Sequence, residues 1–241
     1  MIVVVPIDLG SEPLTTLVDE SALEPAEANE LYAAAVTDVI CSAESSGGSV
    51  LVNYRGRASD VDGRDGAAAA RSFVSDGLDD PDAVRFEPQV GSNRSARIGN
   101  TVTHILTRED ASSVGILSPT APLVRRPEID GVAMSARRNE VILGSNGVGG
   151  LYLSAFSEPI DFTDAYRPPA VASVARRASE AGLGVGFAPA VATIDTEVGL
   201  AATIATIQAR RSASKPIPTE TARVVSDLEV TTHDGRSLSR S

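Results

Sequence analysis

The sequence contains no tryptophan, a single cysteine, two histidines and, at 4%, few aromatic residues. One cysteine, Cys41, excludes an internal disulfide and suits a reducing compartment, and we expect it to be a small buried residue of a helix. His104 lies in an apolar helical segment and His233 lies near the end of the chain, so neither supports a zinc site or a Ser–His–Asp triad. With so few aromatics, Ala, Val, Ile and Leu must fill the core, as they do in parallel or mixed sheets covered by helices.

Lysine is almost absent as well, because Lys215 is the only one, and the net charge is −11. Binding to nucleic acid or to an anionic membrane needs basic patches, so we expect no nucleic-acid partner. Scarce lysine, abundant carboxylates and small core residues are typical of a halophile-like protein from a salt-rich cytoplasm, where hydrated carboxylates keep proteins soluble. A high-GC genome, which favours Ala, Gly and Arg over Lys, is the alternative explanation.

Long hydrophobic runs are absent too. No apolar run reaches the roughly 18 residues of a membrane span, and the first residues lack the basic region and cleavage site of a signal peptide. We therefore expect a cytoplasmic protein without a membrane span.

Strand-like and helix-like segments alternate along most of the 241 residues. The all-apolar run Met1–Pro6 predicts a strand buried on both faces, and Pro25–Ser45 predicts a helix with Pro at its first turn. Further strands are expected at 48–55, 83–89, 113–124, 140–143, 151–156 and 184–194, and further helices at 67–78, after 90, at 126–139, 168–183 and 195–213. Asp195 or Thr196 is the expected N-cap of the last helix.

This alternation predicts one three-layer α/β/α sandwich with a mixed, mostly parallel sheet. Two adjacent strands around Gly144–Gly150 break the alternation and suggest one antiparallel insertion. We assign residues 1–210 to this domain. Residues 211–241 are polar and are expected to form a C-terminal tail with at most one edge strand, Val224–Val230.

Four loops should gather beyond the carboxyl ends of the strands, where open α/β sheets bind ligands. They are Ile7–Leu17, Pro88–Arg97, Leu117–Arg126 and Gly144–Gly150, and all are rich in Gly, Ser, Pro, Asn or Arg. The first loop matches neither the Rossmann glycine motif nor the P-loop. We name no catalytic residue, and the predicted nucleotide-binding residues are Gly10, Ser11, Thr15, Gly91, Arg94, Arg97, Ser118, Thr120, Asn146, Gly149 and Gly150.

Metal ligands are sparse in these loops. The third and fourth loops carry no carboxylate, and the nearby acids Asp8, Glu140, Asp161 and Asp164 have no convincing ligand spacing, so no metal site is predicted. The acidic turn Asp60–Gly66 superficially resembles a calcium loop, but Arg71 stands where an EF-hand needs a glutamate.

Five segments, taken in order, resemble an uncharacterised family of glycosyltransferase-like proteins. They are LEPAEANELYAAAVTDVI, FEPQVGSNRSARIGNTV, LSPTAPL, VILGSNGVGGLYL and VATIDTEVGLAA, and the similarity that rests on them covers roughly residues 1–208. The resemblance implies the nucleotide-diphospho-sugar transferase (GT-A) fold, with distant similarity to 2-phospho-L-lactate guanylyltransferase. It also implies nucleotidyl or glycosyl transfer from an activated nucleotide or nucleotide sugar, and it leaves the cofactor open between Mg²⁺, Mn²⁺ and no metal.

The sequence departs from the family's pattern at its charged positions. Thr15, with Leu14 or Thr16, stands where the family has a lysine and an arginine that would hold phosphate. Thr120 and Val148 each replace a motif aspartate, while Arg97 and Asp195 are kept. Two functions therefore stay open: a transferase with degenerate phosphate and metal motifs, or a catalytically inactive binding or regulatory module. A homo-oligomer is also left open.

Overall fold

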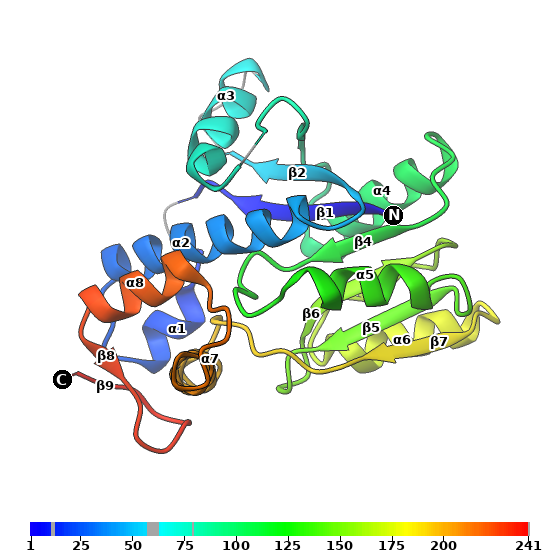
Figure 1. Cartoon of the computed structure of the whole chain (residues 1–241). Helices are drawn as coiled ribbons and strands as arrows, with labels where there is room; N and C mark the ends of the chain where they lie inside the picture. The colour runs from blue at the N-terminus through cyan, green and yellow to red at the C-terminus, as the bar shows by residue number, and fades with distance from the viewer. Residues whose placement is uncertain (11–12, 57–62, 79, 241) are drawn as a thin grey trace.

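A seven-stranded sheet forms the centre of the computed structural model, which describes residues 1–10, 13–56, 63–78 and 80–240 (Figure 1). Its strands lie in the order β3-β2-β1-β4-β6-β5-β7. Their bounds are β1 Ile2–Asp8, β2 Ser49–Arg55, β3 Arg85–Pro88, β4 Val114–Leu117, β5 Val141–Ser145, β6 Leu151–Phe156 and β7 Val185–Ala188. Strands β1, β2, β3 and β4 are mutually parallel, and β6 runs antiparallel to both of its neighbours, β4 and β5. The predicted mixed sheet with one antiparallel insertion is confirmed.

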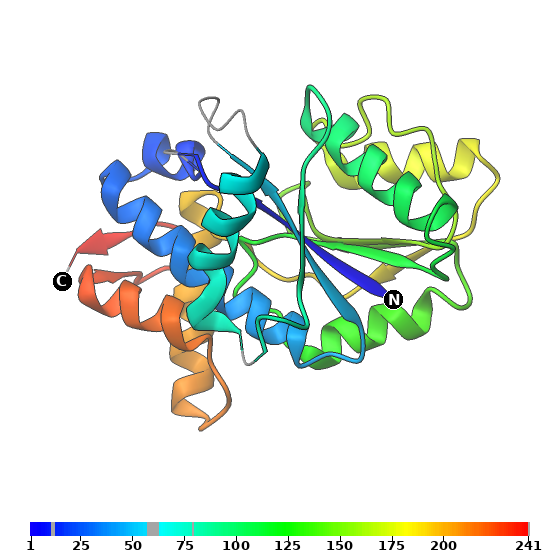
Figure 2. The same ribbon diagram turned by 90° about the horizontal axis from the view of Figure 1, so that it is seen from above.

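Helices cover both faces of this sheet, as Figure 2 shows. Their bounds are α1 Thr15–Glu20, α2 Pro25–Glu44, α3 Gly63–Val74, α4 Arg94–Thr107, α5 Arg126–Ser135, α6 Ala170–Glu180, α7 Glu197–Ser212 and α8 Thr219–Asp227. A 3₁₀ turn, Ser75–Gly77, follows α3. The predicted three-layer α/β/α sandwich is confirmed.

Strand β1 explains the two cores. Successive side chains of a strand point to opposite faces. Val3, Val5 and Ile7 pack into the core formed with α2, α3, α5, α7 and α8, whereas Val4 packs into the core formed with α4 and α6. Each of these four side chains is at most 1% exposed. An uninterrupted apolar run is the expected sequence of a strand covered on both faces.

The C-terminal residues fold against the domain instead of forming a tail. The expected edge strand Val224–Val230 is wrong, because α8 extends to Asp227 and only Val230–Thr231 form a short strand, β8, which pairs with β9 (Ser239–Arg240). Thr221, Ala222, Val224 and Val225 are buried at helical spacing. The backbone N–H groups of Glu220 and Thr221 donate to the carboxylate of Asp38 on α2, at 3.2 and 2.7 Å. Asp38 thus caps α8 from another helix.

Removal of this cap gives a stability prediction. Asp38→Ala should lower the free energy of unfolding by about 1–2 kcal/mol, because two N–H groups at the start of α8 lose their acceptor. Urea unfolding followed by circular dichroism measures the change. Glu30→Ala, an exposed position on the same helix, is the matched control and should change stability by less than about 0.5 kcal/mol. Equal effects of the two substitutions would contradict the capping role.

Two further predictions concern Cys41 and the acidic turn Asp60–Gly66. Cys41 is exposed and not buried, and its thiol donates to the carbonyl oxygen of Gly77, 2.9 Å away. The acidic turn that resembles a calcium loop begins at Asp60, and its first residues lie outside the described ranges.

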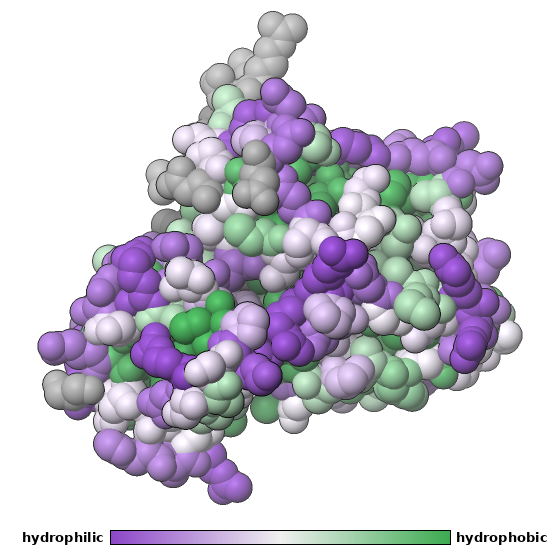
Figure 3. Space-filling view, in the orientation of Figure 1, coloured by the Kyte–Doolittle hydropathy of each residue, from purple (hydrophilic) through white to green (hydrophobic). Residues whose placement is uncertain are grey.

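Within the described ranges, no helix is both long enough and apolar enough to cross a membrane. The face in Figure 3 carries hydrophilic residues across its width, with smaller hydrophobic areas between them.

Candidate functional site

A cleft of about 160 Å³ lies at the carboxyl edge of the sheet, where β1 and β4 part. The chain moves from β1 outward to β2 and β3 and then returns to the other side of β1 to form β4. In open α/β sheets this topological switch point is where ligands bind. The lining comes from the ends of β1 and β2, from the segments after β3 and β4, and from Asp195. Its residues are Pro6, Ile7, Asp8, Pro13, Tyr32, Asn53, Arg55, Gln89, Arg94, Arg97, Ile98, Ser118, Pro119, Thr120 and Asp195.

The first turn of α4 forms one wall of the cleft. The helix begins at Arg94 because the side chain of Asn93 accepts a hydrogen bond from the Ala96 N–H, at 2.9 Å. Gly91 has φ +143°, and a Cβ there would lie 2.7 Å from the Arg97 nitrogen, so only glycine lets the loop close on this turn. The first N–H groups of a helix lack intrahelical acceptors and carry partial positive charge, which favours anions. Arg94 and Arg97 add two guanidinium groups to this wall.

Positive charge exceeds negative charge in the cleft, although the whole chain is acidic. Three arginines and two aspartates line the cleft within the described residues. Arg55 forms an ion pair with Asp8, whereas Arg94 and Arg97 form no ion pair with any residue that the structure describes. Burial and the neighbouring guanidinium groups lower the pKa of Arg97. Arginine still remains charged at neutral pH, so the charge of the cleft favours an anionic ligand.

The opposite wall carries a chain of buried hydroxyl groups that ends at a carboxylate. Ser118 Oγ and Thr120 Oγ1 lie 2.8 Å apart, and Thr120 Oγ1 donates to Asp195 Oδ2 at 3.0 Å. Thr196, and not Asp195, is the N-cap of α7, since its hydroxyl accepts from the Gly199 N–H at 3.1 Å. Asp195 is therefore left to face the cleft.

The floor is held by residues that sequence reasoning did not single out. The Gln89 amide donates to the carbonyl oxygens of Ile7 and Asn53, at 3.0 and 2.8 Å, and so ties the ends of β1 and β2 together. The Asp8 N–H donates to the Tyr32 hydroxyl at 2.9 Å. Burial raises the pKa of Tyr32, and the charges of Asp8 and Asp195 raise it further, so this hydroxyl stays protonated.

The predicted site residues lie at different places relative to the cleft. Arg94, Arg97, Ser118 and Thr120 line the cleft. Two predicted glycines stand beside it: Gly10, whose N–H donates to Asp8 Oδ1 at 2.9 Å, and Gly91 under α4. None of the remaining predicted residues that the structure describes lines it. Thr15 is exposed at the start of α1, and Ser11 lies outside the described residues.

The glycine-rich turn between β5 and β6 reaches the carboxyl edge but is not part of the cleft lining. Its own asparagine shapes it, since Asn146 Oδ1 accepts from the N–H groups of Val148 and Gly150, at 3.1 and 2.8 Å. Gly147 and Gly149 have φ +86° and +88°, a conformation that favours glycine. The Asn146 amide donates to Thr193 Oγ1 at 3.2 Å, which places the turn behind the Asp195 segment. Asn146 therefore links the turn to the segment that carries Asp195, and Asn146, Gly149 and Gly150 are not among the residues that line the cleft.

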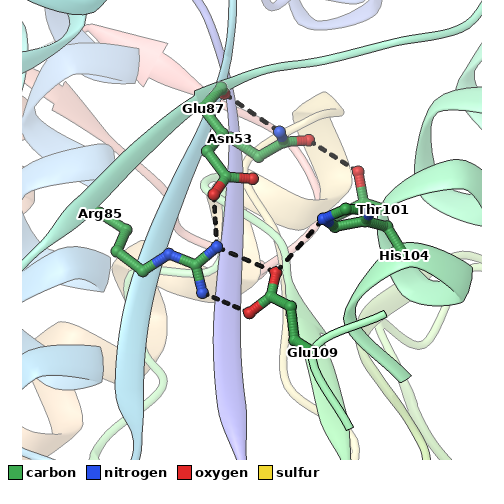
Figure 4. A network of polar contacts seen from close by, with 6 residues as sticks. All are labelled: Asn53, Arg85, Glu87, Thr101, His104 and Glu109. Carbon is green, nitrogen blue, oxygen red and sulfur yellow. Dashed lines mark hydrogen bonds and ion pairs between the residues drawn. The ribbon is translucent and has the colours of Figure 1, made fainter. Parts of the chain in front are cut away.

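A polar network fixes α4 against the sheet (Figure 4). The Asn53 amide donates to the Glu87 carbonyl oxygen at 3.1 Å, and its oxygen accepts from the Thr101 hydroxyl on α4 at 3.2 Å. Arg85 pairs with Glu109 at 2.7 Å, and the hydrogen bond from Arg85 holds the pKa of Glu109 below its usual range. His104 approaches the same carboxylate, at 3.6 Å. This network positions the helix that carries Arg94 and Arg97, and it places His104 outside the cleft.

Metal ligands are few in the cleft. No group of three or more His, Cys, Asp or Glu side chains is placed to hold a metal ion in the part of the chain that the structure describes. The two cleft carboxylates are already engaged: Asp8 pairs with Arg55 and accepts from the Gly10 N–H, and Asp195 accepts from Thr120. Only Asp195 Oδ1 has no hydrogen bond among the described residues, so the cleft fits poorly to an octahedral Mg²⁺, which usually takes one or two carboxylates beside phosphate oxygens.

No family model matches the chain, and no curated protein matches its sequence. Solved structures do match its fold. A candidate nucleotide-diphospho-sugar transferase of Desulfovibrio desulfuricans G20 superposes with a TM-score of 0.74 at 14% identity, over 94% of each chain. A cytidylyltransferase of Leptospira borgpetersenii superposes with a TM-score of 0.49 at 10% identity, over 94% of this chain and 93% of the other. The first likeness shows that the chain has the nucleotide-diphospho-sugar transferase fold, as the sequence predicted.

Proposed function

We propose that the cleft binds the phosphate groups of a nucleotide or a nucleotide sugar, and that the protein is a transferase acting on this activated donor by nucleotidyl or glycosyl transfer. The observation that carries the proposal is the pair of guanidinium groups, Arg94 and Arg97, without a carboxylate partner at the N-terminus of α4. Guanidinium groups and free helix N–H groups are the donors that phosphate oxygens prefer. The position at the β1/β4 switch point and the fold support the same ligand class.

The geometry also suggests what each residue would contribute. Arg94 and Arg97 would balance the charge that builds up on a transferring or departing phosphate, which is usually the largest electrostatic term in such a reaction. Asp195, held by Thr120 through only one of its oxygens, would accept a hydrogen bond from a hydroxyl of the sugar or the ribose. Tyr32 and Gln89 would keep the end of β1 in place beneath the ligand.

Binding is tested by calorimetric titration with GTP, CTP, UDP-glucose and GDP-mannose, at low and at molar potassium chloride. Arg97→Ala should weaken the binding of the ligand that gives heat by about 10–100-fold, because a hydrogen bond to a charged group contributes roughly 1.5–3 kcal/mol. Arg138→Ala removes the same charge from an exposed position before β5, at the other edge of the sheet, and should leave binding unchanged. Absence of heat with all four ligands would refute the proposal.

A second function rests on a specific observation. Thr120 supplies a neutral hydroxyl in the cleft, and Thr15 supplies no cation at the start of α1, so this chain could retain binding and lack turnover. Phosphorus NMR of the bound donor separates the two functions. Release of diphosphate or of a nucleoside diphosphate that disappears in Arg97→Ala would establish a transferase. A bound donor that stays intact with sugar phosphates and sugars as acceptors would indicate a binding module.

A further inference from the structure

The polar groups of the cleft are arranged as they would be for an anion that arrives without a metal ion. A divalent cation bound there would share the cleft with three guanidinium groups, and like charges repel more strongly in a partly buried site than in water. It would also have to compete with Arg55 for Asp8, and only one oxygen of Asp195, Oδ1, would be open to it. The cleft therefore offers a metal ion one carboxylate oxygen without a hydrogen bond, beside three guanidinium groups.

We infer that the cleft holds the phosphates of its ligand with guanidinium groups in place of a divalent cation, so that binding requires neither Mg²⁺ nor Mn²⁺. The inference rests on the proposed function, and it adds which groups of the protein would bind the phosphates. Arg94 and Arg97 supply the charge that a metal would otherwise supply. Guanidinium groups can bind phosphate through two parallel hydrogen bonds, which provides geometry as well as charge.

Thr120 is the residue that sets this choice. Its side chain is 4% exposed, and its hydroxyl donates to Asp195 Oδ2 at 3.0 Å. A carboxylate at this position would face the carboxylate of Asp195 at hydrogen-bond distance, and two such charges require a cation or a shared proton between them. The threonine hydroxyl instead satisfies one oxygen of Asp195 without adding charge. The other oxygen, Oδ1, forms no hydrogen bond with a described residue and is left for a hydroxyl of the ligand.

The ligand class follows from both walls taken together. The α4 wall selects a phosphate, and the Asp195 wall selects a hydroxyl donor. The ligand should therefore be a nucleotide or a nucleotide sugar whose hydroxyl groups are free. The phosphate should bind better as a dianion. Because its second ionisation lies near pH 6, affinity for a terminal phosphate should rise from pH 5 to pH 7.5.

The first test compares the titrations of the wild-type protein in EDTA and in Mg²⁺. We expect dissociation constants that agree within about twofold. A constant at least tenfold weaker in EDTA would overturn the inference and leave the proposed function standing. Absence of binding in both solutions would refute the proposed function, and the inference with it. The two failures are thus distinguishable in one experiment that needs no variant.

The second test creates the site that the cleft lacks. Titration of Mn²⁺ alone, followed by the electron paramagnetic resonance of the free ion, should show no binding to the wild-type cleft. Thr120→Asp should bind Mn²⁺ at least tenfold more tightly than the wild type, since it places two carboxylates side by side. Thr120→Asn, similar in size and uncharged, should behave as the wild type. Binding of Mn²⁺ by the wild type as tight as that of Thr120→Asp would overturn the inference.

Discussion

Gly199→Ala is expected to lower the free energy of unfolding by about 3 kcal/mol, the upper part of the range for an overpacked interior site. Gly199 lies in the first turn of α7, and a Cβ there would come within 2.0 Å of the Thr193 carbonyl oxygen. That oxygen belongs to the backbone, so no change of rotamer can move it away. The helix or the segment that carries Asp195 must shift. Urea unfolding followed by circular dichroism measures the loss.

Gly131→Ala is the matched control, because it makes the same chemical change in α5 with no atom within 4 Å of the added methyl group. It should raise stability by about 0.5–1 kcal/mol, since alanine is a better helix former than glycine. If both substitutions stabilised the protein, the close packing of α7 on the Asp195 segment would be wrong. The displaced segment should also reduce nucleotide affinity in Gly199→Ala, and affinity should be unchanged in Gly131→Ala.

Replacing Arg94 and Arg97 together with alanine should have the largest effect on affinity. Each guanidinium group is expected to contribute roughly 1.5–3 kcal/mol to phosphate binding, so the double substitution should weaken binding by about 10²–10⁴-fold if the two contributions add. Both residues start a helix whose position is fixed separately by Asn53, Thr101 and Asn93, so the fold should persist. Calorimetry measures affinity, and the thermal midpoint reports on the fold.

The control for the double substitution is Arg137→Ala with Arg138→Ala. It removes the same two charges from exposed positions before β5. Its affinity should equal that of the wild type within about twofold. Equal losses in both double variants would show that only the overall charge of the protein matters, and would remove the reason to place phosphate at α4. A partial recovery with lysine at both positions would separate the charge from the two-bond geometry of arginine.

The sheet was predictable because its signals are local. A run of β-branched residues predicts β1, and two apolar segments around a glycine-rich turn predict the β5–β6 pair. Helix α8 was not predictable in this way. Its buried residues, Val224 and Val225, have strong strand propensity, and its cap, Asp38, lies 183 residues earlier in the chain than Thr221. Tertiary packing decided its conformation.

The candidate site was also predictable only in part. Arg94 and Arg97 lie in the helix after β3, and Thr120 lies in the loop after β4, so their place at the carboxyl edge follows from the order of elements. Arg55 was missed because its role depends on register: it is the residue of β2 that pairs with Asp8 of β1. The sequence did contain this signal, because β1 ends in the acidic Asp8 and β2 ends in the basic Arg55. The predicted glycines after β5 do not line the cleft, because Asn146 folds their turn onto itself.

The walls of the cleft come from positions as far apart as Asp8 and Asp195, so almost the whole fold must be assembled before any ligand can be held. Melting experiments can therefore serve as a search tool. A compound that occupies the cleft binds only the native state and should add about 2.7 kcal/mol of stability at a concentration one hundred times its dissociation constant. Screening a library of phosphorylated metabolites for a rise in melting temperature would find the natural ligand without any prior guess about the reaction.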